Sequence, residues 1–116
     1  MRHRKKGYLL GREKEQREAL IRGLMIALIE HRRIQTTLAK AKAVQPEMEK
    51  LISLARQDTP HNRRMALSRL ASKTAMRRLF SFAPTQYADR TSGFTRITKL
   101  GQRQGDGATM VQIELL

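Results

Sequence analysis

The sequence contains no cysteine, which excludes disulfide bonds and thiolate metal sites. This absence is typical of proteins that work in a reducing compartment. No apolar run approaches the roughly 20 residues that a membrane-spanning helix needs. After the charged start, the apolar stretch Tyr8, Leu9 and Leu10 is shorter than the about 7–15 apolar residues of a signal peptide. We therefore expect a soluble, cytoplasmic protein.

Aromatic residues are also scarce, and the five present are Tyr8, Phe80, Phe82, Tyr87 and Phe94. Modules that read single-stranded RNA stack bases on exposed aromatic side chains. Residues 92–100 contain a Gly-Phe pair but lack the further aromatics of the ribonucleoprotein motif. Base stacking is therefore not the expected mode of binding, and a standard RNA-recognition module is disfavoured.

Acidic residues are the third shortage. Ten Asp and Glu oppose 24 Lys and Arg, which gives a net charge of +14. Residues 1–12 and the stretch between Asp58 and Asp89 contain no acid at all. Self-repulsion at this charge opposes compaction, so a polyanionic partner is expected, and nucleic acid is the first candidate. A hydrophobic content of 40% is too high for a wholly disordered basic tail, and 116 residues suit one domain.

Groups that carry catalysis or bind metals are missing. The three histidines have no metal-ligand spacing: His3, His31 and His61. No pair of carboxylates lies in the apolar setting that raises a pKa for acid–base chemistry. Three glycines, Gly101, Gly105 and Gly107, do not form a phosphate-binding loop and are better explained by a hairpin that needs positive φ angles. We expect no enzyme, no metal and no cofactor.

The first half of the chain predicts an arm, a helix, a strand and a second helix. Residues 1–12 are basic and aperiodic, so we expect an extended arm that is disordered alone and orders on nucleic acid. Apolar residues repeat at helical spacing over 13–31, a brief strand follows at 32–37, and the clearest helical stripe covers 38–55. Thr36 or Thr37 can cap that helix, and Pro46 predicts a kink or a new helix start inside it.

The second half predicts two more helices and a hairpin. Thr59 and Pro60 begin a helix over 60–71, and the next helix covers 72–82 and is ended by Pro84. Residues 85–93 are expected to form a loop. Strands at 93–101 and 110–115 then form a hairpin with a long, flexible, basic loop. The predicted fold is α+β, a two-layer domain of residues 13–116 with order α-β-α-α-α-β-β and helices on a small mixed sheet.

The longest apolar stripes predict the core. It should consist of residues from the first two helices packed on the last strand: Leu24, Leu28, Val44, Met48, Leu51, Val111 and Ile113.

Basic pairs on two successive helices leave two interpretations open. Arg63 with Arg64 and Arg77 with Arg78 can contact phosphates, or they can form a solvated face whose stems cover apolar surface. A DNA-binding regulator or nucleoid protein that uses helices 60–71 and 73–82 is an alternative function. The connection at residues 70–73 is a poor helix-turn-helix turn because it contains no glycine.

Several sequence blocks resemble a known family. RIQTTLAKAKAVQP at residues 33–46 and GFTRITKLGQRQGD at residues 93–106 are similar to bacterial large-subunit ribosomal protein seventeen, and the resemblance is collinear from Met1 to the last strand. It implies a structural, non-enzymatic protein that binds and stabilises large-subunit ribosomal RNA near the peptide exit tunnel, beside other large-subunit proteins. It implies no membrane and no small-molecule substrate.

The resemblance and the charge pattern together predict the RNA contacts. Positions that match the family blocks are Arg2, His3, Gly7, Arg12, Arg22, Arg33, Thr36, Thr37, Lys40, Lys42, Arg96, Lys99 and Arg103. The charge pattern adds Arg4, Lys5, Lys6, Arg63 and Arg64. The chain departs from the family pattern at Gln16, Gly23, Ser92 and Phe94.

Overall fold

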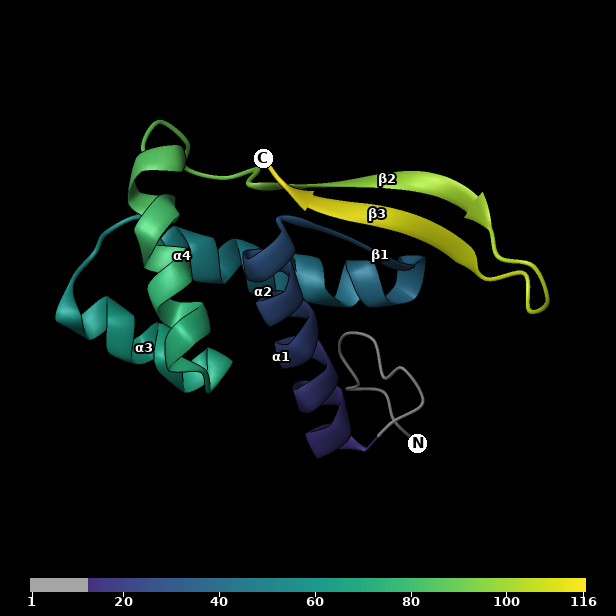
Figure 1. Ribbon diagram of the computed structural model, residues 1–116, viewed down its shortest axis with the longest axis horizontal. Helices are drawn as coiled ribbons and strands as arrows, with labels where there is room; N and C mark the ends of the chain where they lie inside the picture. Colours follow the sequence, from purple (N-terminus) through teal and green to yellow (C-terminus); the bar gives the residue numbers. More distant parts are fainter. Residues whose placement is uncertain (1–12) are drawn as a thin grey trace, which may run out of the picture.

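A computed structural model describes residues 13–116 as four helices and a three-stranded sheet (Figure 1). The elements are α1 (Lys14–His31), β1 (Arg33–Thr37), α2 (Leu38–Ala55), α3 (Pro60–Leu70), α4 (Lys73–Gln86), β2 (Thr95–Gln102) and β3 (Thr109–Leu115). α1 and α2 contact the sheet, and α3 and α4 pack against these two helices. This order and the α+β class confirm the sequence prediction. The predicted arm, residues 1–12, lies outside the described residues.

The sheet has the order β1-β3-β2 and is antiparallel throughout, not mixed as predicted. β3 lies between its neighbours, with Ile113 opposite Ile34 on one side and Ile97 on the other. A hairpin makes β2 and β3 antiparallel, so a mixed sheet would need β1 to run parallel to its neighbour, whereas β1 is antiparallel to β3. β3 takes the central position, because its alternate side chains Val111, Ile113 and Leu115 are buried and the central strand is the best-covered place for them.

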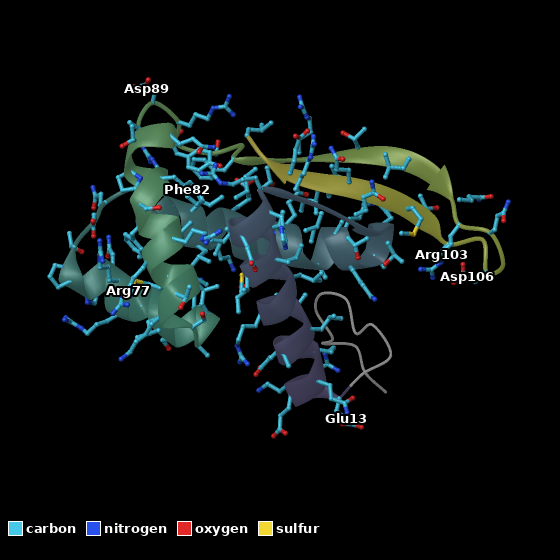
Figure 2. All side chains as sticks on the ribbon, in the orientation of Figure 1. Glu13, Arg77, Phe82, Asp89, Arg103 and Asp106 are labelled. Carbon is cyan, nitrogen blue, oxygen red and sulfur yellow. The ribbon has the colours of Figure 1, made fainter. Side chains whose placement is uncertain are left out.

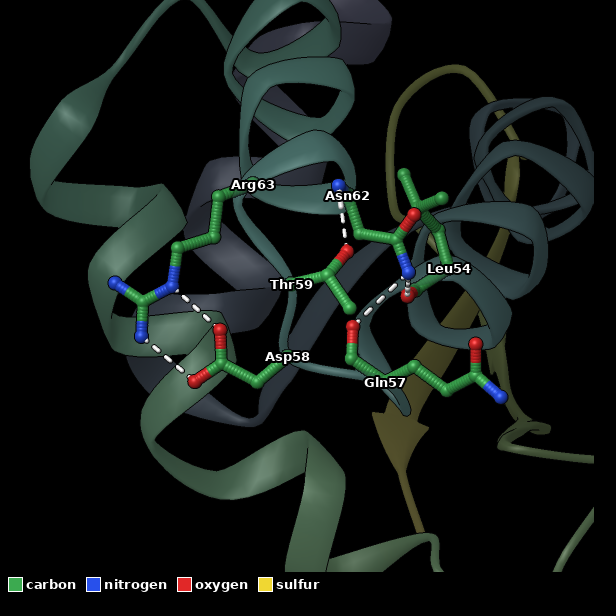
Figure 3. A network of polar contacts seen from close by, with 6 residues as sticks. All are labelled: Leu54, Gln57, Asp58, Thr59, Asn62 and Arg63. Carbon is green, nitrogen blue, oxygen red and sulfur yellow. Dashed lines mark hydrogen bonds and ion pairs between the residues drawn. The ribbon is translucent and has the colours of Figure 1, made fainter.

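Hydroxyl side chains begin three of the helices. Thr37 Oγ1 accepts from the Lys40 N–H at 3.4 Å, and Ser72 Oγ accepts from the Ala75 N–H at 3.2 Å. Thr59 Oγ1 accepts from the Asn62 N–H at 3.1 Å, with Pro60 as the first helical residue (Figure 3). Each bond satisfies a backbone donor that the first helical turn leaves without a partner. The predicted caps at Thr37 and Thr59 are therefore confirmed.

The sequence predicted that Pro46 and Pro84 would interrupt or end helices, and this prediction is wrong. α2 runs continuously through Pro46, and α4 passes Pro84 and ends at Gln86. A helical proline removes only one backbone donor, and packing can compensate for that loss. Around Pro46 the buried Val44, Met48 and Leu51 hold α2 in place. After Pro84, the Tyr87 N–H still donates to the Ala83 carbonyl at 3.1 Å.

The hairpin loop is shorter than predicted. β2 continues past a bulge between Lys99 and Gly101, so Gln102 still pairs with Thr109. The turn beyond is closed by the Arg103 N–H donating to the Ala108 carbonyl at 2.8 Å. The three hairpin glycines have positive φ as predicted: Gly101 at 126°, Gly105 at 97° and Gly107 at 70°.

The core lies between the sheet and the helices, where α2 is central (Figure 1). All predicted core residues are fully buried except Leu24, which is partly buried at the edge: Leu28, Val44, Met48, Leu51, Val111 and Ile113. The largest buried side chains, however, are Tyr87 and Phe94. Their rings meet edge to face at 5.2 Å between centroids. No helix of residues 13–116 has the length and hydropathy that crossing a bilayer requires.

We expect Leu51→Ala to lower the free energy of unfolding by about 2–5 kcal/mol, because truncation of a fully buried leucine leaves a cavity. The matched control is Leu100→Ala, which deletes the same atoms where the side chain is 50% exposed. That change should cost less than about 0.5 kcal/mol. Urea denaturation of both variants measures the two values, and equal costs would contradict this assignment of the core.

Candidate nucleic-acid interface

Seven predicted contacts lie outside the described residues: Arg2, His3, Arg4, Lys5, Lys6, Gly7 and Arg12. The remaining ones fall on the hairpin, on the corner between β1 and α2, on the start of α3, and in a groove beside α1. They do not form a single patch, because the hairpin tip and α3 lie at opposite ends of the long axis (Figure 2).

The hairpin presents Arg96, Lys99 and Arg103 to solvent. Arg96 donates from Nε and Nη2 to Glu114 Oε1 at 3.1 and 2.8 Å across the β2–β3 pair. Arg103 makes a two-pronged ion pair with Asp106 inside the turn, near the tip of the hairpin (Figure 2). Each guanidinium group is therefore paired with an acid that orients it and offsets part of its charge.

The turn lowers the pKa of Asp106 from 3.8 to about 2. The principal cause is the hydrogen bond from Arg103, and the Ala108 N–H, which donates to Asp106 Oδ1 at 3.1 Å, adds to it. Both donors favour the charged carboxylate, which explains the direction. The same interaction raises the pKa of Arg103.

At the corner between β1 and α2, the predicted contacts have different environments. Arg33 and Lys42 are exposed, and Lys40 is half-buried. Thr36 is only 8% exposed within the sheet, so its side chain offers little surface to a partner. Thr37 uses its hydroxyl to cap α2. The two threonines are thus explained by the fold, whereas the basic residues around them face outward.

At the start of α3, Arg63 is held in the same way as the hairpin arginines. Its Nε and Nη2 donate to Asp58 Oδ1 and Oδ2 at 2.6 and 2.8 Å (Figure 3). This pairing lowers the pKa of Asp58 and raises that of Arg63. The guanidinium carbon also lies 5.3 Å from the centre of the Phe80 ring. Arg64, in contrast, is exposed.

The second basic pair lies on α4. Arg77 (Figure 2) and Arg78 are both exposed, and Arg78 Nη1 donates to the Glu30 carbonyl at the end of α1 at 3.5 Å. The connection from α3 to α4 consists of Ala71 and Ser72, with Ala71 at a φ of 53°. Glycine is the usual residue in this left-handed region, so alanine is strained there. Because only two residues connect α3 to α4, the chain has to take this left-handed conformation at Ala71.

A groove of about 750 Å³ lies between α1, α2 and the end of α3. It brings together two predicted contacts that are far apart in the sequence, Arg22 and Lys42. It also contains basic residues that sequence reasoning missed: Lys14, Arg17, Lys50 and Arg69. The signal available was helical spacing, since Lys14, Arg22 and the apolar Ile21 and Met25 share one face of α1. That α2 and α3 complete the groove requires the tertiary structure.

The described residues offer no alternative chemistry. Within 13–116, no three His, Asp or Glu side chains are grouped so that they could hold a metal ion. What the arrangement can do is present guanidinium and ammonium groups to an anion from several sides.

A family model described as ribosomal protein L17 matches residues 20–116. The chain belongs to the ribosomal protein L17 family. A relative from Chloroflexus aggregans, named large ribosomal subunit protein bL17, is 71% identical over 116 residues, which are the whole of both chains. Nothing in the fold or among the L17 relatives supports a DNA-binding regulator.

More distant L17 relatives carry the same name. The protein from Thermomicrobium roseum is 46% identical over all of this chain and 99% of its own length. That from Carboxydothermus hydrogenoformans is 50% identical over 94% of this chain and 97% of its own. The resemblance found in the sequence blocks is therefore confirmed over the full length of this L17 chain.

In a carbon-detected NMR titration, the Asp106 carboxylate should titrate with a midpoint at about 2. Because its pKa is lowered in the fold, the turn contact is intact above pH 3.8 and is lost as the pH falls through about 2. Arg103→Met should move the midpoint towards 3.8, whereas Arg64→Met, a matched change on α3, should leave it in place. A wild-type midpoint near 3.8 would show that the ion pair does not form in solution.

Proposed function

We propose that this protein is a non-enzymatic structural constituent of the large subunit of the bacterial cytoplasmic ribosome. It binds and stabilises large-subunit ribosomal RNA near the peptide exit tunnel and contacts neighbouring large-subunit proteins. The observation that carries the proposal is the 71% identity over the whole chain to a protein named large ribosomal subunit protein bL17. The function requires no cofactor, membrane or small-molecule substrate.

The charge supports binding through phosphates. A net charge of +14 favours the release of counterions from an RNA backbone. Exposed basic residues on separate elements, Arg33, Lys42, Arg64 and Lys99, are available for such contacts. Contacts spread in this way suit a folded RNA, whose surface presents phosphates from several directions.

The aromatic residues support the same mode of binding by being unavailable for base stacking. Phe80, Tyr87 and Phe94 are buried at 3%, 0% and 1% exposure. Phe82 is half-buried, and the Arg32 guanidinium covers its ring at 3.6 Å from the centroid. Within residues 13–116 the fold therefore offers no exposed aromatic platform for a single-stranded base.

The three arginines that form ion pairs with surface acids can exchange the carboxylate for a phosphate. The Arg63–Asp58, Arg96–Glu114 and Arg103–Asp106 pairs are open to solvent, which screens them, so they contribute little to stability. A phosphate accepts the same two-pronged geometry as a carboxylate. Each acid thus holds a guanidinium ready for RNA without fixing it strongly in the free protein.

The chain divides into an RNA-binding arm, residues 1–12, and a folded domain, residues 13–116. The arm carries five basic and no acidic residues. Within the described residues the buried core runs from Met25 to Leu115, which supports placing the boundary before residue 13.

Affinity for large-subunit RNA should fall steeply with salt. If roughly 6–10 phosphates are contacted, the association constant should drop by about 10³–10⁵ between roughly 50 and 200 mM salt. Filter binding over this range measures the slope. A shallow slope would point to base-edge or stacking contacts, and absence of binding to the RNA would contradict the proposed function.

Deletion of residues 1–10 should separate folding from assembly. The truncated protein should melt close to the intact one, because the core lies within residues 25–115. It should join large subunits poorly in reconstitution followed by sedimentation, because four of the five basic residues of the arm are lost. Unfolding of the truncated protein would show that the division at residue 12 is wrong.

A further inference from the structure

The groove beside α1 has an apolar floor and a strongly basic rim. α1 contributes Ile21 and Met25 to the lining, and α2 contributes Ala43 and Pro46. Six basic side chains surround this surface, against two acids: Lys14, Arg17, Arg22, Lys42, Lys50 and Arg69 face Glu18 and Glu47. Glu47 Oε1 lies 3.9 Å from Lys50 Nζ. Because this ion pair is exposed, it offsets little of the positive charge of the rim. The groove is therefore built to receive an anion.

The Nε atom of Arg22 is buried and has no hydrogen-bond partner among the described residues. Within residues 13–116, its Nε is the buried side-chain nitrogen or oxygen that no acceptor satisfies. A buried donor left in this state costs free energy, and nearly all such groups in folded proteins have partners. The residue lies in the wall of the groove. A hydrogen-bond acceptor on a ligand bound in the groove would satisfy this nitrogen.

The opposite wall contains a backbone carbonyl that lacks its usual helical donor. Pro46 has no N–H, so the Lys42 carbonyl receives no hydrogen bond from the residue four positions later in α2. Lys42 and Pro46 both line the groove.

We propose that this groove is a second RNA-binding site, in which Arg22 donates to a backbone phosphate and the Lys42 carbonyl accepts from a ribose 2′-hydroxyl. The site is distinct from the arm and from the hairpin, and it rests on the proposed function. The apolar floor packs against the sugar faces, while Lys14, Lys50 and Arg69 contribute charge along the rim.

The chemistry of the groove favours RNA over the other anionic partners. The rim repels other positively charged groups, and the sequence of residues 1–12 carries five positive charges and no negative one. An acidic protein segment can satisfy Arg22 with a carboxylate, but it places fewer negative charges along six basic side chains than a nucleic-acid backbone does. The RNA backbone alternates phosphate acceptors with hydroxyl donors and so matches both walls.

The first test compares the full-length protein with Arg22→Met in filter binding to large-subunit RNA. Arg22→Met should weaken binding by about 10- to 100-fold, since a hydrogen bond to a charged group is lost. Its salt slope should fall by about 1. Arg22→Lys keeps the charge without the Nε donor and should also bind at least about 5-fold more weakly. The control Arg77→Met makes the same charge change on α4 and should alter binding less than about 3-fold.

Thermal melts of the free proteins exclude a purely structural role. Because Nε has no partner within the described residues, Arg22→Met should melt at the wild-type temperature or above it. A melting temperature well below wild type, with RNA binding lowered only in proportion to the unfolded fraction, overturns the site.

The second test identifies the occupant directly. Since the chain has no cysteine, Ser68→Cys places a single thiol on the groove wall for a short photocrosslinker. Ser53→Cys is the matched control, exposed on α2 and outside the lining. In reconstituted large subunits, the probe at residue 68 should crosslink to ribosomal RNA, at a yield at least about 5-fold above that at residue 53.

The outcomes separate this inference from the function on which it rests. Wild-type protein that neither binds RNA nor enters subunits overturns both. Wild-type binding with Arg22→Met unchanged, or crosslinking from residue 68 to a protein, overturns the RNA site alone. Full binding by Arg22→Lys overturns the role given to Nε.

Discussion

Burial of α2 is the constraint on which the rest of the structure depends. This helix contacts every other helix and strand of the described fold. Its apolar residues Val44, Met48, Leu51 and Ile52 are fully buried, and each such side chain contributes roughly 1.5–3 kcal/mol. The three strands and the three other helices all pack against the apolar face of α2, and its opposite face is exposed (Figure 1). Both the hairpin and the basic groove are therefore positioned relative to α2.

A polar link complements this packing where the hairpin begins. Glu49 on α2 accepts from the Phe94 N–H at 3.2 Å and from the Thr95 hydroxyl at 2.6 Å. Gln45, one turn earlier, donates to the same hydroxyl at 3.1 Å. Glu49, one of only ten acidic residues in the chain, thus makes its hydrogen bonds within the fold. It holds the start of β2, so the exposed basic groups further along the hairpin project from a fixed base.

The sequence was sufficient for the features that depend on local patterns. The stripes of α1 and α2, the caps at Thr37 and Thr59, and the hairpin glycines follow from spacing and residue type. Strand order was not accessible, because the choice between β2 and β3 as the neighbour of β1 depends on which strand the helices cover. Tyr87 and Phe94 were missed as core residues because they flank a segment that has no period.

The candidate site was predictable only in part for the same reason. Charge and family blocks identified exposed basic residues such as Arg33, Lys42 and Lys99. They could not distinguish Thr36, which the sheet buries, from its exposed neighbours. Nor could they reveal the groove, whose walls come from three helices. Partners such as Asp58 for Arg63 arise where the chain turns into α3, and spacing alone does not specify that geometry.

The strand order also has a consequence for synthesis. β3 is the central strand but follows both β1 and β2 in the chain, so a translating ribosome delivers it after its two neighbours. Until then, β1 has no partner, and the apolar face of α2 lacks the cover of Val111 and Ile113. Long-range pairing of this kind is slow to form and exposes strand edges meanwhile. A nascent chain interrupted before residue 109 would therefore be a target for chaperones or proteases, which gives the cell a means of removing incomplete copies.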